Sequence, residues 1–286
     1  MNEARAAMFW EEAESKGVLC GLCPHGCEIS EYAAGFCGVR ENRDGRLFAL
    51  SYGQVSSVAL DPIEKKPLRM FCPGTQVLSI GGYGCNLRCP FCQNSAISLE
   101  YKERRQAVTP EYIAELAVQA VPHGNIGVAY TYNEPFIGYE FLLDCARLVR
   151  GAGLKNVVVT NGFVRPEPLD RLLPFIDAMN IDLKGFTSAF YEGLCGGLEA
   201  VKETVSLSHR RCHVEISTLV IPGENAYDIE NIAAWIASLS PDIPLHLSRF
   251  FPRYKYLRKA PTPREEIFRL CEIAGKHLKN VFPGNI

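Results

Sequence analysis

Cysteine is the residue type whose number and spacing in this sequence could support chemistry. The 286 residues include 12 cysteines, and two groups of them are clustered. One group is Cys85, Cys89 and Cys92, and the other is Cys20, Cys23, Cys27 and Cys37. Because the start of the chain, MNEARAAMFWEEAESK, is charged and has no apolar stretch, it does not resemble a secretory signal, so we expect clustered cysteines to bind metal rather than form disulfides. The scattered cysteines are expected to be buried core thiols: Cys72, Cys145, Cys195, Cys212 and Cys271.

The triplet Cys85, Cys89 and Cys92 has the spacing C-x3-C-x2-C. Three close thiolates suit a [4Fe–4S] cluster, which normally takes four cysteine ligands. With three ligands, one iron stays open to an outside ligand, as a catalytic zinc keeps an open position. A structural zinc site built on Cys89 and Cys92 is the alternative, and it needs a second pair of thiolate or imidazole ligands.

The amino-terminal cluster offers four thiolates, from Cys20, Cys23, Cys27 and Cys37, together with His25. Neighbouring glycines would let the chain turn tightly around an ion. A zinc ion with four thiolate ligands is one interpretation. A second iron–sulfur cluster is another, although the spacing differs from the usual ferredoxin run. Redox-active thiols without metal are the third.

Composition excludes several classes of protein. The chain is 47% hydrophobic and 22% charged, which is typical of a globular protein and not of a disordered one. Thirty basic and 32 acidic residues give a net charge of −2, so nucleic acid is an improbable partner. No apolar run approaches the ~18 residues of a membrane helix, and we expect a cytoplasmic protein. A short basic and aromatic run at 249–259 is expected to be a solvated loop rather than a lid or a nucleic-acid contact.

Elements that could position the cysteines follow from the hydrophobic pattern. Short β-branched stretches are expected as strands at 76–82, 125–131, 156–161, 178–184, 213–220 and 244–250. Amphipathic helical patterns separate them. Thr109 before Pro110 predicts one helix start, and Thr262 with Glu265 predicts a capping box at another. Strand–helix alternation indicates a parallel sheet with crossover helices.

Polar side chains on one face of the strands favour a barrel over an open sheet. Asn180 and Asp182 share a face of the fourth strand, Glu215 lies on the fifth, and His246 on the sixth. A doubly wound sheet buries both faces under helices and should be apolar on both. We therefore predict an α/β fold with a partial (β/α)6 TIM-like barrel over 76–286. Residues 1–75 are expected to form a cysteine-rich segment with an acidic helical start and short strands.

These motifs together resemble the radical S-adenosylmethionine (radical SAM) superfamily. The resemblance rests on the triplet, on the aromatic residue before its last cysteine, and on its place after the first strand of a (β/α)6 barrel. It implies that S-adenosylmethionine binds the open iron and that one electron cleaves it to methionine and a 5′-deoxyadenosyl radical, which abstracts hydrogen from a substrate. It also implies a one-electron donor such as flavodoxin or ferredoxin.

The resemblance assigns further residues to the cofactor site. Phe91 matches the aromatic residue beside the adenine. Glu134 matches the last residue of the superfamily's GGE element, which holds the methionine ammonium, although Tyr132 and Asn133 stand where that element has glycines. The expected cofactor-binding residues are Phe91, Asn133, Glu134, Asn161, Asp182, Lys184, Glu215 and His246.

Two of these assignments have plainer alternatives. Asp182 and Lys184 resemble the D-x-K element of glycyl-radical activating enzymes, but could be a solvated pair at a strand edge. Asn161 before Gly162 could be a simple strand-end turn. Glu215 and His246 are expected in the barrel interior without an assigned role.

Within the superfamily, four stretches of the sequence resemble the AmmeMemoRadiSam-system enzymes, which are relatives of pyruvate formate-lyase activating enzyme. The stretches are GYGCNLRCPFCQN, AYTYNEPF, NIDLKGF and HLSRFFPRY. That resemblance implies Memo-like and AMMECR-like partner proteins. Longer members continue into a tail with a further cysteine pair, beyond the point where this sequence stops. The alternatives are a glycyl-radical enzyme activase and, from another class, a zinc-ribbon binding module with a degenerate barrel.

Overall fold

One sheet of eight strands forms the centre of the molecule. The structure is a computed structural model that describes residues 5–14, 17–100 and 105–286. The strands lie in the order β16-β15-β14-β13-β12-β11-β9-β8. Neighbours from β9 to β16 are parallel, and β8 pairs antiparallel with β9. The bounds are β8 (Ser57–Pro62), β9 (Gln76–Gly81), β11 (Asn125–Thr131), β12 (Lys155–Thr160), β13 (Ala178–Asp182), β14 (His213–Val220), β15 (Leu245–Arg249) and β16 (Val281–Gly284).

The six strands expected from the sequence are confirmed as β9 and β11 to β15. Among the described residues no ladder joins β8 to β16, so the barrel is partial, as predicted. The sheet differs from the expectation at its two edges. It begins at β8 and not at residue 76, because the Ser57–Pro62 strand pairs with β9 along its whole length. It also gains β16, a short strand that contains Pro283.

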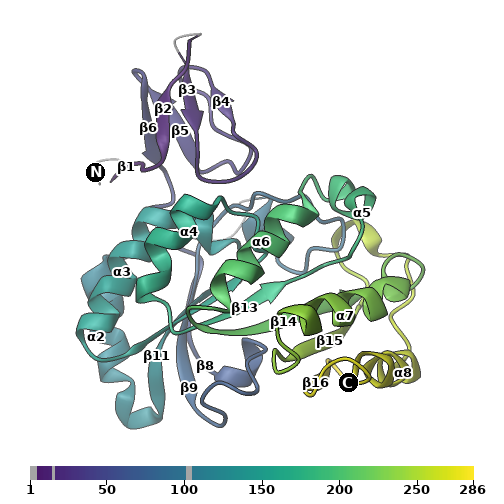
Figure 1. The fold of residues 1–286 in the computed structure, drawn as a ribbon. Coiled ribbons are helices and arrows are strands. Elements are labelled where there is room, and N and C mark those ends of the chain that lie inside the picture. Colours follow the sequence, from purple (N-terminus) through teal and green to yellow (C-terminus); the bar gives the residue numbers. More distant parts are fainter. Residues whose placement is uncertain (1–4, 15–16, 101–104) are drawn as a thin grey trace.

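Helices connect the strands and cover the outer face of the sheet (Figure 1). They are α1 (Ser95–Ser98), α2 (Pro110–Gln119), α3 (Tyr139–Gly151), α4 (Pro166–Leu172), α5 (Ser188–Gly193), α6 (Leu198–Ser208), α7 (Ile229–Leu239) and α8 (Arg264–Ala274). Short 3-10 turns lie at Ile63–Lys65, Val121–His123, Pro135–Gly138, Leu173–Phe175, Ala226–Asp228 and Tyr254–Tyr256. No helix of the described residues is long and apolar enough to cross a membrane.

The two predicted helix starts have different outcomes. Thr109 caps α2 as expected, because its side chain accepts a hydrogen bond from the backbone N–H of Tyr112. The capping box at Thr262 is wrong. The buried Thr262 hydroxyl instead donates to the carbonyl of Val220 and accepts from the backbone N–H of Phe250. The Thr262 side chain thus bonds to distant backbone groups and not to the start of α8, where the local pattern placed it.

The interior of the barrel is polar, as the strand faces predict. Asn180, Glu215, Ser217 and His246 are all buried. The segment between β8 and β9 fills one part of the interior, since Asn180 Nδ2 donates to the carbonyl of Pro67 at 2.8 Å. This segment also contributes Ile63 and Leu68 to a small apolar cluster with residues of β9, β11, β12 and β13.

Residues 5–14 and 17–49 form a small lobe, here called the amino-terminal lobe, which stands over α3 and α4 (Figure 1). It has two sheets of three short strands, in the orders β1-β6-β5 and β2-β3-β4. The strands are β1 (Arg5–Ala6), β2 (Trp10–Glu12), β3 (Val18–Cys20), β4 (Glu28–Ile29), β5 (Arg40–Arg43) and β6 (Arg46–Ala49). The acidic helical start is therefore wrong for the described residues, because β1 and β2 occupy it. A further pair, β7 (Gln54–Val55) and β10 (Gln106–Ala107), lies outside the lobe.

Candidate active site

The cysteine triplet lies in the loop of residues 82–94, here called the triplet loop, between β9 and α1. Cys89 is buried, and Cys85 and Cys92 are half-buried. Burial raises the pKa of the Cys89 thiol to about 11 and raises that of Cys85 further. These thiols would therefore stay protonated at neutral pH unless a cation such as a metal centre stabilises the thiolates.

The three thiols of the triplet share one loop and offer only sulfur donors. Within the described ranges, no three Cys, His, Asp or Glu side chains converge on a common point. Ligands of a single zinc ion would stand within about 4 Å of one another, since each Zn–S bond is ~2.3 Å. The thiolates of a [4Fe–4S] cluster bind different irons and are farther apart. Three thiolates on one loop are a donor set that such a cluster can use.

Two N–H groups already point at the sulfur of Cys85. The backbone N–H of Leu87 donates to Cys85 Sγ at 3.4 Å, and Asn161 Nδ2 donates to the same sulfur at 3.6 Å. Hydrogen bonds to sulfur stabilise the thiolate and tune iron–sulfur ligands. Asn161 comes from the end of β12, so the structure brings this predicted residue to the triplet.

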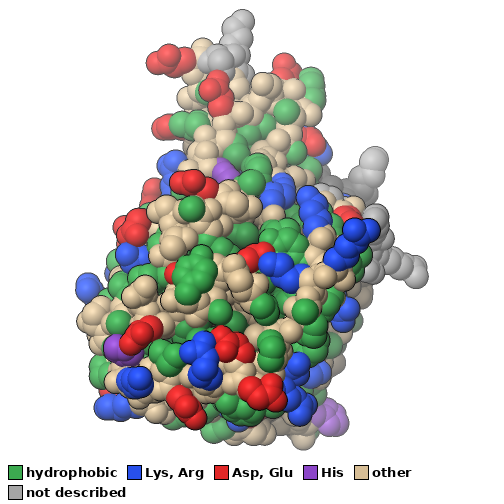
Figure 2. All heavy atoms as spheres, turned by 90° about the vertical axis from the view of Figure 1, so that its right-hand side faces the viewer, with side chains coloured by type: hydrophobic (Ala, Val, Ile, Leu, Met, Phe, Trp, Pro, Cys, Tyr) green, Lys and Arg blue, Asp and Glu red, His purple; other side chains and the backbone are tan. Residues whose placement is uncertain are grey.

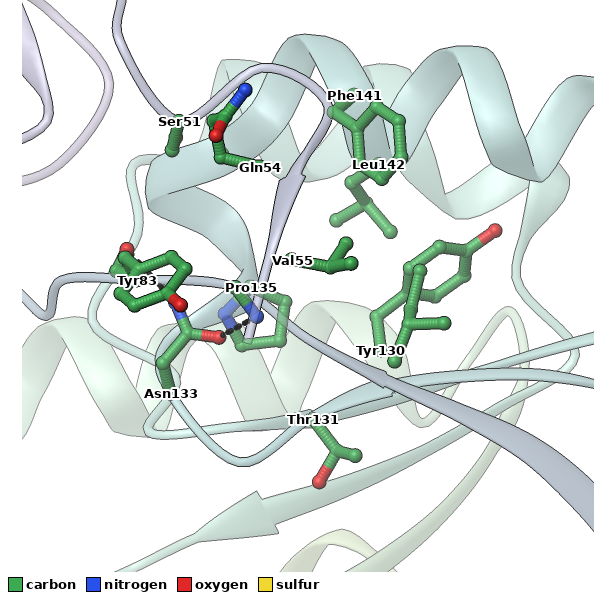
Figure 3. A pocket seen from close by; sticks show the side chains of 13 residues that line it. Ser51, Gln54, Val55, Tyr83, Tyr130, Thr131, Asn133, Pro135, Phe141 and Leu142 are labelled. Atoms are coloured by element: carbon green, nitrogen blue, oxygen red, sulfur yellow. Dashed lines mark hydrogen bonds between the residues drawn. The ribbon is translucent and has the colours of Figure 1, made fainter. Parts of the chain in front are cut away.

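Asn133 holds the beginning of the triplet loop. Its Oδ1 accepts from the backbone N–H of Gly82 at 2.9 Å, and its Nδ2 donates to the carbonyls of Tyr83 and Gly84 at 3.1 Å each. Figure 3 shows Asn133 and Tyr83 at the edge of a mainly apolar pocket that also includes Phe141 and Leu142 of α3. The cysteines of the triplet do not line this pocket, so the contacts of Asn133 are those of a residue that shapes the loop.

Glu134 is buried, and its carboxyl group joins the ends of two strands. Its Oε1 accepts from Thr160 Oγ1 at 2.8 Å and from the backbone N–H of Phe136 at 3.0 Å, while Oε2 accepts from the backbone N–H of Asn161 at 2.8 Å. Burial raises the pKa of Glu134 to about 7 in spite of these bonds. Oε1 accepts two hydrogen bonds and Oε2 accepts one, so Oε2 can accept a further hydrogen bond.

Asp182 and Lys184 form an ion pair of 2.7 Å after β13. Burial alone would lower the pKa of Lys184, but Asp182 and Cys89 outweigh burial and raise it. The ammonium also favours the thiolate form of Cys89 and of Cys92. The pair therefore lies close enough to the triplet to act on its thiols, at the end of a central strand, with the Asp182 side chain 38% exposed and that of Lys184 16% exposed.

Glu215 and His246 lie elsewhere in the barrel interior. Glu215 Oε2 is 2.6 Å from His246 Nε2, and Glu215 Oε1 is 2.9 Å from His213 Nε2. The backbone N–H groups of Arg69 and Met70 donate to the same carboxylate. Burial opposes ionisation, yet these bonds lower the pKa of Glu215 to about 2. Both residues stand near the starts of their strands and face the interior, as predicted. Glu215 is bonded to the segment between β8 and β9, and His246 is bonded to Glu215.

A second buried polar cluster was not expected from the sequence. Tyr132 Oη donates to Asp61 Oδ2 at 2.6 Å, and the buried Lys66 Nζ lies 2.9 Å from the same oxygen. Tyr132 has φ +72°, a conformation that favours glycine. The replacement of a glycine of the GGE element by Tyr132 was the signal in the sequence that could have drawn attention to this position.

The basic and aromatic run is exposed at Arg253, Lys255 and Arg258, as expected of a solvated loop, and part of it packs on the triplet loop. The backbone N–H of Lys255 donates to the carbonyl of Pro90 at 2.9 Å, and the ring of Tyr256 is 6.0 Å from that of the buried Phe91. The loop after β15 lies on the right-hand side of Figure 1, and on the face seen from that side in Figure 2 Lys and Arg side chains are spread over both flanks with Asp and Glu side chains among them.

Comparisons with known proteins agree with this geometry. An uncharacterized protein of Methanocaldococcus jannaschii is 42% identical over 294 residues, which cover 99% of this chain and 85% of that protein. A second protein of that organism, named as a glycyl-radical enzyme activating enzyme, is 27% identical over 214 residues, covering 70% of this chain and 85% of that protein. The crystal structure of Streptococcus suis SuiB bound to S-adenosylmethionine has a TM-score of 0.54 at 16% identity and shares the fold over 71% of this chain and 48% of that one.

The family model of the radical SAM superfamily matches residues 79–236, from β9 into α7. This range contains the triplet loop and the ends of β11, β12 and β13 that surround it. Members of the superfamily use a [4Fe–4S] cluster and S-adenosylmethionine. The chain belongs to the radical SAM superfamily and is a radical SAM enzyme.

Proposed function

We propose that Cys85, Cys89 and Cys92 bind the [4Fe–4S] cluster and that the protein cleaves S-adenosylmethionine to abstract hydrogen from a substrate. When bound, the reduced cluster supplies one electron to S-adenosylmethionine, which yields methionine and a 5′-deoxyadenosyl radical. The observation that carries the proposal is the meeting of the triplet with Asn161 and Lys184 at one end of the sheet. Ligands bind at the carboxyl ends of parallel strands in barrels of this type.

The chain's own residues would orient the cofactor. Asn161 donates to Cys85 Sγ, and Lys184 keeps a positive charge near Cys89. Glu134 Oε2 is free to accept one more donor, and the methionine ammonium is a donor of suitable charge. Phe91 is buried beside Tyr256 and would provide the flat apolar surface for the adenine. Asn133 would act indirectly, through the conformation of the triplet loop.

For the reaction partners we propose the AmmeMemoRadiSam system, with Memo-like and AMMECR-like proteins beside this chain. Flavodoxin or ferredoxin would deliver the electron in the cytoplasm, where thiols are kept reduced. The division of the chain into a cysteine-rich amino-terminal part over 1–75 and a barrel over 76–286 belongs to the same proposal. The sequence motifs AYTYNEPF and HLSRFFPRY support this choice of system.

A glycyl-radical enzyme activase is the second candidate. It is supported by the name of the relative that is 27% identical. The Asp182–Lys184 pair, which resembles the D-x-K element of such activases, adds to that support. The two candidates differ in the protein that stimulates cleavage of S-adenosylmethionine. An activase would leave a radical on a glycine of its partner, which electron paramagnetic resonance detects.

The test is product formation by the anaerobic full-length protein with dithionite and S-adenosylmethionine. We expect 5′-deoxyadenosine and methionine from the wild type and neither from Cys85→Ala. Addition of Memo-like and AMMECR-like proteins should increase the yield. Wild-type protein that contains its full cluster but forms no more 5′-deoxyadenosine than Cys85→Ala would contradict the proposal.

A further inference from the structure

The four cysteines of the amino-terminal lobe line one small pocket. Cys20 ends β3, Cys23 and Cys27 follow in the next turn, and Cys37 comes from the loop before β5. The backbone N–H of Cys20 donates to the carbonyl of Cys27 at 2.9 Å, which fixes the two strands of this hairpin against each other. Four residues from three chain segments thus enclose a common space.

His25 lines the same pocket but is already engaged. Its Nε2 is 2.8 Å from the carbonyl oxygen of Asn86, and its ring lies 4.2 Å from that of Phe36. This bond occupies Nε2 and leaves Nδ1 as the ring nitrogen that could bind a metal, since metal-bound histidines commonly donate their other N–H to a carbonyl. The pocket therefore encloses four sulfurs, with His25 beside them.

Two N–H groups in the pocket wall favour negative charge on the sulfurs. The backbone N–H of Phe36 donates to Cys27 Sγ at 3.5 Å. Arg40 is 1% exposed and pairs with Glu140 at 3.1 Å. Within the part of the chain that the structure describes, its Nε is buried without a hydrogen-bond partner. An unpaired buried guanidinium N–H is costly, and an anionic sulfur centre in this pocket would satisfy it.

The pocket also touches the triplet loop. Gly84 has φ +82°, and a Cβ there would lie 2.7 Å from the carbonyl oxygen of Cys37. Asn86, next to Cys85, contacts His25 through its carbonyl and accepts from Asn161 Nδ2 at 2.9 Å through its side chain. The amino-terminal pocket and the triplet are therefore joined by a short series of direct contacts.

We propose that Cys20, Cys23, Cys27 and Cys37 bind a thiophilic metal, zinc or iron, as a closed four-thiolate centre that fixes the triplet loop through Gly84 and Asn86. The four thiols do not yet converge on one point in the described residues, so binding draws them together around the pocket. Four protein ligands leave no open position, which is typical of a structural or electron-transfer centre. Only the effect on the triplet loop rests on the proposed function.

The test is the metal content of anaerobically purified full-length variants. In the triple variant Cys85→Ser/Cys89→Ser/Cys92→Ser, we expect bound zinc or iron to remain, at about one zinc ion per chain if the metal is zinc. Adding Cys20→Ser/Cys37→Ser should remove it, whereas adding Cys195→Ser/Cys271→Ser, two scattered cysteines, should not. Zinc in the triple variant would indicate a structural centre, and iron an electron-transfer centre.

A triple variant that contains no more metal than the variant lacking Cys20 and Cys37 would overturn the proposal. To guard against misfolding of the latter variant, Co²⁺ is added to the triple variant after its metal has been removed. Visible absorption bands of tetrahedral thiolate-bound cobalt are expected, and their absence would also overturn the proposal. Failure of the proposed function gives a different result, because the wild type would then contain no more metal than the triple variant.

Discussion

The two cysteine sites of this protein differ in how completely the chain surrounds them. The triplet has three cysteines on one loop, and side chains from the ends of β12 and β13 approach it from other parts of the sheet. The amino-terminal pocket has four cysteines and is otherwise lined largely by apolar groups such as Leu22, Ile29 and Ile137. A site with an unfilled position can bind a reactant, whereas a closed site can only stabilise or transfer electrons. The number of thiolates and the polarity around them distinguish the two roles.

Removing one cysteine of the triplet should have the largest effect. Cys85→Ala, Cys89→Ala or Cys92→Ala leaves only two thiolates for the cluster, so we expect cleavage of S-adenosylmethionine to fall below detection. Iron content and 5′-deoxyadenosine formation measure this. Cys195→Ala is the control and should behave as the wild type, because Cys195 lies outside both sites and is exposed; the buried core position expected for it was wrong. Any triplet variant with a full cluster and normal cleavage would show that the two sites have been assigned wrongly.

Gly84→Ala tests whether the two sites depend on each other's position. A side chain at φ +82° is strained, and its Cβ would meet the carbonyl oxygen of Cys37 at 2.7 Å. We expect the free energy of unfolding to fall by about 2–4 kcal/mol. Denaturant unfolding gives this value. The control is Gly193→Ala in α5, where a Cβ meets nothing within 4 Å, and an equal effect of the two changes would refute the close contact.

In the metal-free protein, Glu134 should make the free energy of unfolding depend on pH. Its pKa rises from 4.5 to about 7 on folding, because the carboxyl group is buried. Between these pH values the native state binds more protons than the unfolded state, so this residue's contribution to stability decreases as pH rises through that window. From the lower to the upper end of this pH window, the free energy of unfolding of the wild type should fall by on the order of 3 kcal/mol relative to that of Glu134→Gln. Parallel unfolding curves of the two proteins across this range would mean that Glu134 is not titrating there.

Asn86→Ala should have the smallest effect. It removes the bonds from Asn86 Nδ2 to the carbonyl of Phe163 and from Asn161 Nδ2 to Asn86 Oδ1, together with the side-chain hydrogen bond to Cys23, but leaves every cysteine in place. We expect both metals to be retained, with a shifted electron paramagnetic resonance spectrum of the reduced cluster. The control is Asn280→Ala, a half-buried asparagine before β16 whose Nδ2 donates to the carbonyl of Asp242, far from both cysteine sites. Identical spectra for the wild type and Asn86→Ala would argue that the contacts between the sites do not influence the cluster.

Much of the barrel could be predicted from the sequence, because its strands have strong local signals. β11 and β14 begin and end where the β-branched runs do. Alternation along the strands also predicted the polar interior, including Asn180 and Glu215. Alternation predicts which face of a strand a side chain is on, but not whether the residue lies at the triplet end of the barrel or at the opposite end. Glu215 and His246 face the interior, but the backbone N–H groups of Arg69 and Met70 donate hydrogen bonds to the Glu215 carboxylate there.

The remaining differences come from contacts between distant segments. Thr262 lost its predicted capping role to the carbonyl of Val220, which is far from it in the sequence. The acidic start of the chain forms strands because Arg5 and Ala6 pair with β6, a partner that a helical pattern does not reveal. Tyr132, Asp61 and Lys66 come from three elements, so their cluster has no signature in any one motif.

The most direct test of the central claim is electron paramagnetic resonance of the anaerobically reconstituted, dithionite-reduced protein, recorded with and without S-adenosylmethionine. We predict a [4Fe–4S]⁺ signal that shifts when S-adenosylmethionine is added and that disappears in Cys89→Ala. A cluster signal that S-adenosylmethionine leaves unchanged, or zinc in place of a cluster at the triplet, would contradict the open-iron site.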